Sequence, residues 1–264
     1  MEDLFGSAAP YYARYRPTYG QAVIEHLARA LGADSRVLDL GCGPGTIAIP
    51  LAGRVKMVLA MDPAEEMLAE GRRLAADIPN IMWIRGDSTM LRALPPFDHA
   101  VMGRSFHWMD RRTVLAELDE LLPPGGVVAL VGPARLSGEP WQPSAQPWQP
   151  VERRVCEDFD LEISAAANCY HATEEHHHDI LATSPFSDLE CRTFRRRLVW
   201  DVEGLVGLQL SYSYSSPAVL GDRLHAFVEA LRKALLADSP TGRWEQKLMT
   251  DVLVARRRGA LPSC

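Results

Sequence analysis

Apolar and polar positions in the first half of the chain follow two alternating patterns. Short apolar runs between polar or glycine-rich turns predict buried strands over residues 36–40, 55–61, 81–85, 97–103 and 127–131. Apolar residues recur at helical spacing over 21–31 and 113–122, which predicts helices there. A further helix expected after Thr46 contains Pro50, which should kink it or confine it to a short piece. Strands that alternate with helices predict an α/β fold, a parallel sheet with helices on both faces.

The alternation breaks after residue 131 and returns near residue 189. The segment between them contains the sequence Pro-Trp-Gln-Pro twice, and its prolines exclude a continuous helix. Beyond it, a loosely alternating run predicts a sixth strand at the edge of the sheet, and a later run predicts a seventh, antiparallel strand. The expected strands cover 189–200 and 244–256, and helices are expected between them over 201–213 and 217–237.

A glycine-rich turn, Asp39-Leu-Gly-Cys-Gly-Pro-Gly45, follows the first predicted strand. Glycines have no Cβ, so the backbone can bend sharply there and approach a ligand closely. The dinucleotide fingerprint Gly-x-Gly-x-x-Gly would need a glycine at position 46, where this chain has Thr46. The carboxylate of Asp39 would also repel a pyrophosphate. The turn therefore suits a cationic, amine-bearing ligand better than a dinucleotide.

The run from Asp39 to Gly45 resembles the cofactor loop of class I S-adenosylmethionine (SAM) methyltransferases. The resemblance implies a Rossmann-like, seven-stranded, mostly parallel sheet that binds SAM, with Asp39, Gly41, Gly43 and Gly45 around the cofactor. It covers roughly residues 8–131 by motif and the remainder by the order of elements. Family members commonly insert a substrate cap after the fifth strand. We therefore expect a SAM-binding core with an N-terminal arm over 1–131, a cap over 132–188, and completion of the sheet over 189–264.

Acidic residues follow the second and third predicted strands. Asp62 stands where a nucleoside ribose is held by its two hydroxyls, although an acid there could instead cap the next helix. In Gly86-Asp87-Ser88, Asp87 resembles the adenine-binding acid of the family, and the alternative is an Asx-turn that closes the strand. Met67 resembles an adenine contact of the family, or is a core methionine. We expect these residues to bind the cofactor.

The N-terminal arm contains Tyr12-x-x-Tyr15-Arg16-Pro17, which is similar to the arm of many small-molecule methyltransferases. In that family the tyrosine and the arginine meet the methionine half of SAM. An arginine can donate two hydrogen bonds to a carboxylate, and a tyrosine ring can face a sulfonium. The resemblance therefore assigns Tyr12 and Arg16 to the cofactor. The alternative is a surface arm whose rings pack for area alone.

The segment after the fourth predicted strand, Arg104-Ser-Phe-His-Trp-Met-Asp110, carries the candidate catalytic residue. Ligands bind beyond the carboxyl ends of parallel strands, so this segment should face the reacting group. The pair His107-Trp108 resembles the pair found there in trans-aconitate-type methyltransferases. His107 is the candidate base, although a histidine beside aromatic residues is often only packed. Ser105 and Trp108 are expected to contact the cofactor.

The segment 151–190 contains ten acidic residues and two arginines. We expect it to contact the substrate through Asp158, Tyr170, His171 and Glu174. The run His176-His-His178 suggests a metal, but consecutive histidines on a helix point in different directions, and the sequence has no second cluster at ligand spacing. A solvated, charged face is the better interpretation, and we expect no metal.

Composition narrows the possible partners and compartments. The formal net charge of −6 disfavours tight binding to a phosphate backbone. No apolar run approaches the roughly 18 residues of a membrane span, and the acidic N-terminus lacks an apolar signal core. The five cysteines contain no Cys-x-x-Cys, which fits a reducing cytoplasm. We therefore expect a cytoplasmic protein that acts on a small molecule, without a nucleic-acid or membrane partner.

The acidic cap bears on the substrate, because carboxylates over a site attract cations and repel polyacids. We expect N-methylation of a cationic amino sugar, most specifically an aminoglycoside in antibiotic biosynthesis, as in methyltransferases of the gentamicin-pathway type. One alternative is an O-methyltransferase for a carboxylate or hydroxyl of a small molecule. Another is a non-catalytic SAM-binding regulator.

Overall fold

The computed structural model describes residues 7–133, 146–163 and 175–259, and the chain forms two compact units. The sheet unit comprises residues 18–142, 168–194 and 249–264, and the helical unit comprises residues 1–17, 143–167 and 195–248. These borders differ from those of the three expected segments. The arm belongs to the helical unit, and the segment expected to form a cap is divided between both units. Its role as a substrate cap stays a prediction.

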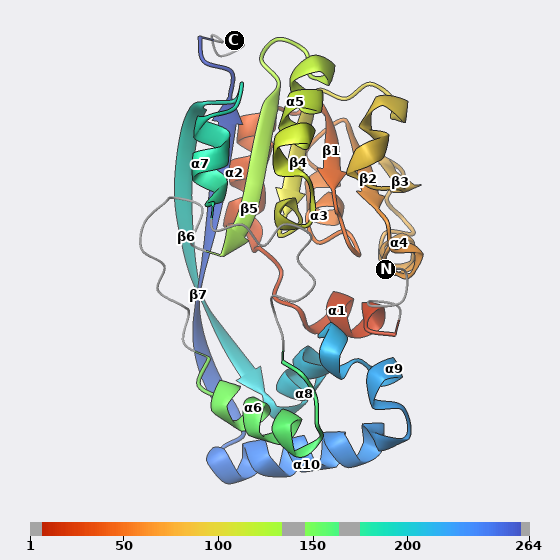
Figure 1. The fold of residues 1–264 in the computed structure, drawn as a ribbon, viewed down its shortest axis with the longest axis vertical. Helices are drawn as coiled ribbons and strands as arrows, with labels where there is room; N and C mark the ends of the chain where they lie inside the picture. The colour runs from red at the N-terminus through yellow and green to blue at the C-terminus, as the bar shows by residue number, and fades with distance from the viewer. Residues whose placement is uncertain (1–6, 134–145, 164–174, 260–264) are drawn as a thin grey trace. The chain divides into compact units, whose positions relative to one another are not determined.

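The sheet has seven strands in the order β3-β2-β1-β4-β5-β7-β6, as Figure 1 shows. Neighbouring strands from β3 to β5 are parallel, and β7 is antiparallel to β5. This confirms the expected Rossmann-like fold, with the sixth strand at the edge. The strands are β1 (Arg36–Leu40), β2 (Met57–Asp62), β3 (Ile81–Arg85), β4 (His99–Gly103), β5 (Val127–Pro133), β6 (Asp188–Asp201) and β7 (Arg243–Arg256).

Successive residues of the central strands enter different cores, because side chains alternate across a strand. In β2, Val58 and Ala60 join one apolar cluster, and Leu59 and Met61 join another. The helices α2 (Gln21–Leu31), α3 (Ala48–Ala52) and α4 (Glu65–Leu74) contribute to the first cluster. The helices α5 (Arg111–Leu121) and α7 (His177–Ala182) contribute to the second. As expected, the helix that contains Pro50 is short.

The helical unit has a core of its own, to which Trp148, Leu205 and Phe227 belong. Gly207 allows α1 (Ala9–Tyr15) and α8 (Val202–Leu210) to meet, since a Cβ there would lie 2.3 Å from the Tyr15 ring. The prediction of a single helix over 217–237 is wrong, because Gly221, with φ of 51°, separates two helices in this range. The helices of this unit are α1 (Ala9–Tyr15), α6 (Gln149–Asp158), α8 (Val202–Leu210), α9 (Pro217–Leu220) and α10 (Leu224–Asp238). Among the described residues, no helix has the length and apolar character needed to cross a membrane.

Candidate cofactor and substrate site

The glycine turn between β1 and α3 has positive φ angles, which residues with a side chain rarely adopt. Gly41, Gly43 and Gly45 have φ values of 74°, 54° and 83°. A Cβ on Gly41 would lie 2.4 Å from the Cβ of Ser105, so the turn passes directly against the end of β4. The N–H of Gly41 donates to the carbonyl of Met61, at 2.8 Å. Positive φ and close contact together explain why glycine occupies this position.

Asp39, the acid before the turn, has one carboxylate oxygen that accepts a hydrogen bond and one that accepts none from the described residues. Its Oδ2 accepts from the backbone N–H of Ala48 at 2.9 Å, which ties β1 to the start of α3. Its Oδ1 is buried and has no hydrogen-bond partner among the described residues. Burial, with the charge of Asp62 as a further cause, raises the pKa of Asp39 to about 7. A buried acceptor of this kind is stabilised by a ligand that brings a positive charge or an N–H group.

Asp62 holds the glycine turn from the end of β2. Its Oδ2 accepts from the N–H of Gly43 at 2.8 Å, and its Oδ1 accepts from the N–H of Ala64 at 2.9 Å. The cap position of α4 is Ala64, so the alternative that made Asp62 the helix cap is wrong by two residues. Each carboxylate oxygen can accept a second hydrogen bond, which leaves room for the expected ribose hydroxyls. That role stays a prediction.

The third strand ends in an Asx-turn, which was the alternative role given for Asp87. The Oδ1 of Asp87 accepts from the N–H of Thr89 at 2.9 Å and from its hydroxyl at 2.6 Å, and the side chain is exposed. Ser88 begins the short helical turn that Asp87 caps. A Cβ on Gly86 would lie 3.0 Å from the Met90 sulfur. Met67 is buried on α4. Adenine contact by these residues stays a prediction.

The segment after β4 places Ser105 beside the glycine turn, and His107 follows two residues later. The hydroxyl of Ser105 donates to the carbonyl of Leu40 at 2.6 Å and so joins the ends of β4 and β1. His107 is half-buried, with its ring 5.3 Å from that of Trp108. Burial, and then the charge of Arg111, lower the pKa of His107. The imidazole is therefore neutral at pH 7 and able to accept a proton.

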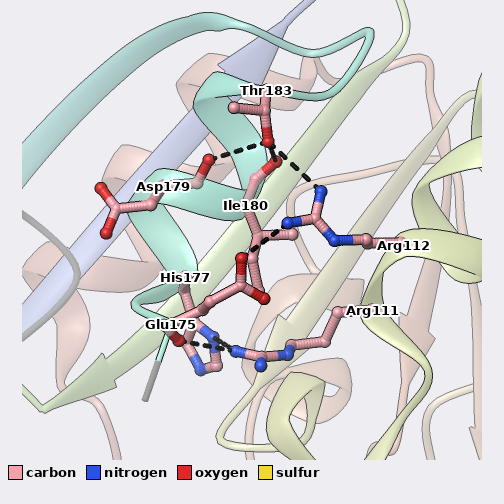
Figure 2. A network of polar contacts seen from close by, with 7 residues as sticks. All are labelled: Arg111, Arg112, Glu175, His177, Asp179, Ile180 and Thr183. Carbon is pink, nitrogen blue, oxygen red and sulfur yellow. Dashed lines mark hydrogen bonds and ion pairs between the residues drawn. The ribbon is translucent and has the colours of Figure 1, made fainter. Parts of the chain in front are cut away.

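A second histidine, His177, begins α7 and faces Arg111 (Figure 2). Nη1 of the buried Arg111 donates to the carbonyl of Glu175 at 3.0 Å and contacts Nδ1 of His177 at 3.2 Å. A guanidinium only donates, so Nδ1 must accept and the proton of His177 must be on Nε2. Burial, followed by Arg111, lowers the pKa of His177 to about 4. Its ring is 6.4 Å from that of His107.

Arg111 and His177 were missed by the sequence analysis, which treated the histidine run as a solvated face. Ile180 and Leu181 follow His177 at helical spacing and are buried in the core shared with α5. This amphipathic pattern is the signal that could have placed His177 on the inner face. Figure 2 also shows Arg112, which pairs with Glu175 at 2.7 Å. Within the described ranges, no group of three or more histidine, cysteine or acidic residues is placed to hold a metal ion.

Several expected site residues lie in the helical unit or outside the described residues. Arg16 donates from Nε to the Ser211 hydroxyl at 2.8 Å, and its guanidinium lies over the ring of Tyr12. Asp158 is exposed at the end of α6. Contact of these residues with cofactor or substrate stays a prediction. Tyr170, His171 and Glu174 lie outside the described residues.

One protein family matches the part of the chain that contains the glycine turn. Residues 37–126, from β1 to the start of β5, match the family model of a methyltransferase domain. Residues 37–126 are therefore similar to a methyltransferase domain. This similarity agrees with the resemblance to class I SAM methyltransferases over that range, and the aminoglycoside type stays a prediction.

Proteins that are similar to this chain include some with and some without a named substrate. An uncharacterized methyltransferase of Mycobacterium tuberculosis is 36% identical over 135 residues, which are 50% of this chain and 52% of that protein. Trans-aconitate 2-methyltransferase of Methylobacterium nodulans is 32% identical over 132 residues, which are 48% of this chain and 50% of that protein. The chain thus spans about half the length of these curated relatives.

Solved structures share the fold over more of the chain than residues 37–126. A methyltransferase-like protein from Anaeromyxobacter dehalogenans has a TM-score of 0.62 and 23% identity, covering 94% of this chain and 100% of that chain. A SAM-dependent methyltransferase from Thiobacillus denitrificans, solved with S-adenosylhomocysteine, has a TM-score of 0.54 and 16% identity, covering 98% of this chain and 99% of that chain. At these identities the likeness establishes the fold.

Proposed function

We propose that this protein is an enzyme that transfers a methyl group from SAM to a small molecule. The carrying observation is Asp39 Oδ1, a buried acceptor without a partner in the described part of the chain, directly before the glycine turn. SAM carries a sulfonium and an ammonium, so its charge complements this carboxylate. The solved Thiobacillus denitrificans protein, with the same fold, holds S-adenosylhomocysteine. The residues that would hold SAM are Asp39, Asp62 and the three glycines of the turn.

The protein's own part in such a reaction is alignment and proton removal. Bound SAM would supply a methyl group that is already attached to a good leaving group. Holding the acceptor in line with it is worth roughly 7–11 kcal/mol in general. His107 is neutral at pH 7 because burial and Arg111 lower its pKa, so it can take the proton that the acceptor loses.

The substrate that we propose is an amino sugar, methylated on nitrogen, and more specifically an aminoglycoside. The supporting observation is the charge of residues 151–190, with ten acidic residues and two arginines. A cationic substrate gains from this charge, and a tricarboxylate is repelled. An amine must be neutral when it attacks, which a nearby neutral base such as His107 makes possible.

A second candidate is O-methylation of a carboxylate, and one observation favours it. Arg111 is buried on α5 and its charge acts on both His107 and His177, so a cation lies beside the candidate base. The relative from Methylobacterium nodulans is named for trans-aconitate. A substrate carboxylate near these residues would be attracted by the same charge.

One experiment distinguishes these functions. The full chain is incubated with SAM and either kanamycin A or trans-aconitate, and released S-adenosylhomocysteine and the methylated product are measured. We expect turnover of kanamycin A. Exclusive turnover of trans-aconitate would replace the first candidate by the second. Binding of SAM without any product across a broad panel of amines, carboxylates and alcohols would favour the non-catalytic regulator.

A further inference from the structure

The helical unit contains a buried acid that the site described above does not use. Glu152, on α6, is 6% exposed, and its Oε1 has no hydrogen-bond partner in the described ranges. Nearly all buried polar groups of folded proteins are hydrogen-bonded, because an unpaired one costs free energy. A buried carboxylate oxygen without a donor therefore points to a ligand that supplies one.

Arg16, a cation of the same unit, does not fill this role. The charge of Arg16 acts on Glu152, yet the described residues include no ion pair between them. Arg16 is held elsewhere, with Nε donating to Ser211 Oγ at 2.8 Å and its guanidinium 4.0 Å from the centre of the Tyr212 ring. Glu152 thus keeps its capacity to bind a second positive group.

A second unpartnered acceptor comes from α8. Gln209 is fully buried, and its Nε2 donates to Cys156 Sγ at 3.2 Å and to Ser215 Oγ at 3.1 Å. These two bonds fix the amide, and its Oε1 is left without a partner within the described residues. Cys156 lies one turn after Glu152 on α6, so Gln209 reaches the same face of that helix.

Aromatic rings complete the surroundings. Tyr212 and Tyr214 stack with their ring centres 5.3 Å apart, and both are half-buried. Tyr214 has a side-chain hydrogen bond with Gln209, and the charge of Glu152 acts on it. The faces of tyrosine rings attract cations. Acceptors that lack a donor, together with these rings, match the three N–H donors and the charge of a primary ammonium.

We propose that Glu152 and Gln209 bind a primary ammonium group of the substrate, at a site made entirely of residues of the helical unit. This inference rests on the proposed function and deepens it, because it names the residues that would select an amino sugar. The ammonium donates to Glu152 Oε1 and Gln209 Oε1, with the stacked tyrosines beside it. Glu152 acts as a binding residue, and no covalent step is involved.

Titration of Glu152 gives the site a distinctive signature. Burial raises the pKa of Glu152 to about 8, so the carboxyl is mostly protonated at pH 7. An ammonium favours the ionised carboxylate, and binding at pH 7 should therefore release a proton from the protein. Burial raises the pKa of the facing Cys156 thiol to about 12 and also raises that of the Tyr214 hydroxyl, so neither group releases a proton at pH 7.

The test is calorimetric titration of the full chain with kanamycin A, for the wild type, Glu152→Gln and Glu157→Gln. Glu157 is exposed on the same helix, so its variant is a matched control. We expect Glu152→Gln to weaken binding by about tenfold or more, the range of a charge-assisted hydrogen bond, and Glu157→Gln to leave it unchanged. Gln209→Met tests the site from α8 and should weaken binding severalfold, so the test remains if Glu152→Gln does not fold.

Titrations in two buffers of different ionisation enthalpy count the protons. The wild type should release close to one proton more than Glu152→Gln per kanamycin A bound at pH 7. Equal affinities of wild type and Glu152→Gln would overturn the proposal, as would a wild type that does not bind kanamycin A or that binds uncharged trehalose equally well. SAM affinity, measured in the same proteins, separates the two ideas: absent SAM binding refutes the proposed function and leaves the ammonium site as measured.

Discussion

The contact between Gly41 and Ser105 allows a prediction with a worked magnitude. In Gly41→Ala, the new Cβ would lie 2.4 Å from Ser105 Cβ and 2.8 Å from Ser105 Oγ. A left-handed backbone costs a residue with a side chain about 1–2 kcal/mol, and overpacking typically adds about 1–3 kcal/mol. We therefore expect the free energy of unfolding to fall by about 2–5 kcal/mol.

The matched control is Gly32→Ala, at the end of α2. Gly32 has φ of 81° and nothing within 4 Å of its Cβ position, so this variant has the backbone cost without the clash. It should lose only about 1–2 kcal/mol. The assay is urea unfolding without ligand, followed by tryptophan fluorescence, with unchanged dependence on denaturant.

A double-mutant cycle isolates the contact itself. Ser105→Gly removes both atoms that the new Cβ at position 41 would meet, at the cost of the hydrogen bond to the Leu40 carbonyl. In its presence, Gly41→Ala should lose no more than the backbone cost, so the coupling energy should be about 1–3 kcal/mol. Equal losses for Gly41→Ala and Gly32→Ala, or a coupling energy of zero, would refute the steric reasoning.

Three further predictions concern charge. The fold binds the Glu152 proton more tightly than the unfolded chain does, since burial raises its pKa from 4.5 to about 8. The free energy of unfolding should therefore fall as pH rises between these values. Glu152→Gln should be more stable than the wild type by a few kcal/mol at pH 9, and it should have no such advantage at pH 4. Urea unfolding at both pH values would measure this difference. Asp39→Asn keeps an acceptor for Ala48 and removes the charge, so calorimetry should show SAM affinity reduced by about tenfold or more; unchanged affinity would contradict the proposed role. Arg111→Gln should raise the pKa of both His107 and His177, because the charge of Arg111 lowers both, and NMR titration of the imidazoles that finds no rise would exclude this coupling.

Elements determined by local pattern could be predicted closely. The strands over 36–40 and 81–85 have the expected ends, because each is an apolar run bounded by turn residues. The mostly parallel, seven-stranded character of the sheet followed from alternation and from the family resemblance. The glycine turn was found because its spacing is itself the signal. The break at Gly221 was missed, because a single glycine inside an apolar helical pattern also occurs in continuous helices.

Features that depend on distant residues could not be predicted in this way. Arg111 and His177 are separated by 66 positions, and only the folded chain brings them together. Glu152 belongs to the acidic segment that was expected to cap the substrate, yet the core of the helical unit buries it. The free oxygen of Asp39 depends on which backbone N–H groups the turn presents. The contacts and hydrogen-bonding capacity of these side chains depend on burial in the tertiary structure, which no local sequence pattern indicates.

The chain enters the helical unit in three separate stretches, residues 1–17, 143–167 and 195–248. No single cut can therefore release that unit as an intact fragment, and no single crossover can exchange it between relatives. A chimaera that aims to transfer substrate preference needs all three stretches from one parent. Change in preference should accordingly accumulate by point substitution within these stretches.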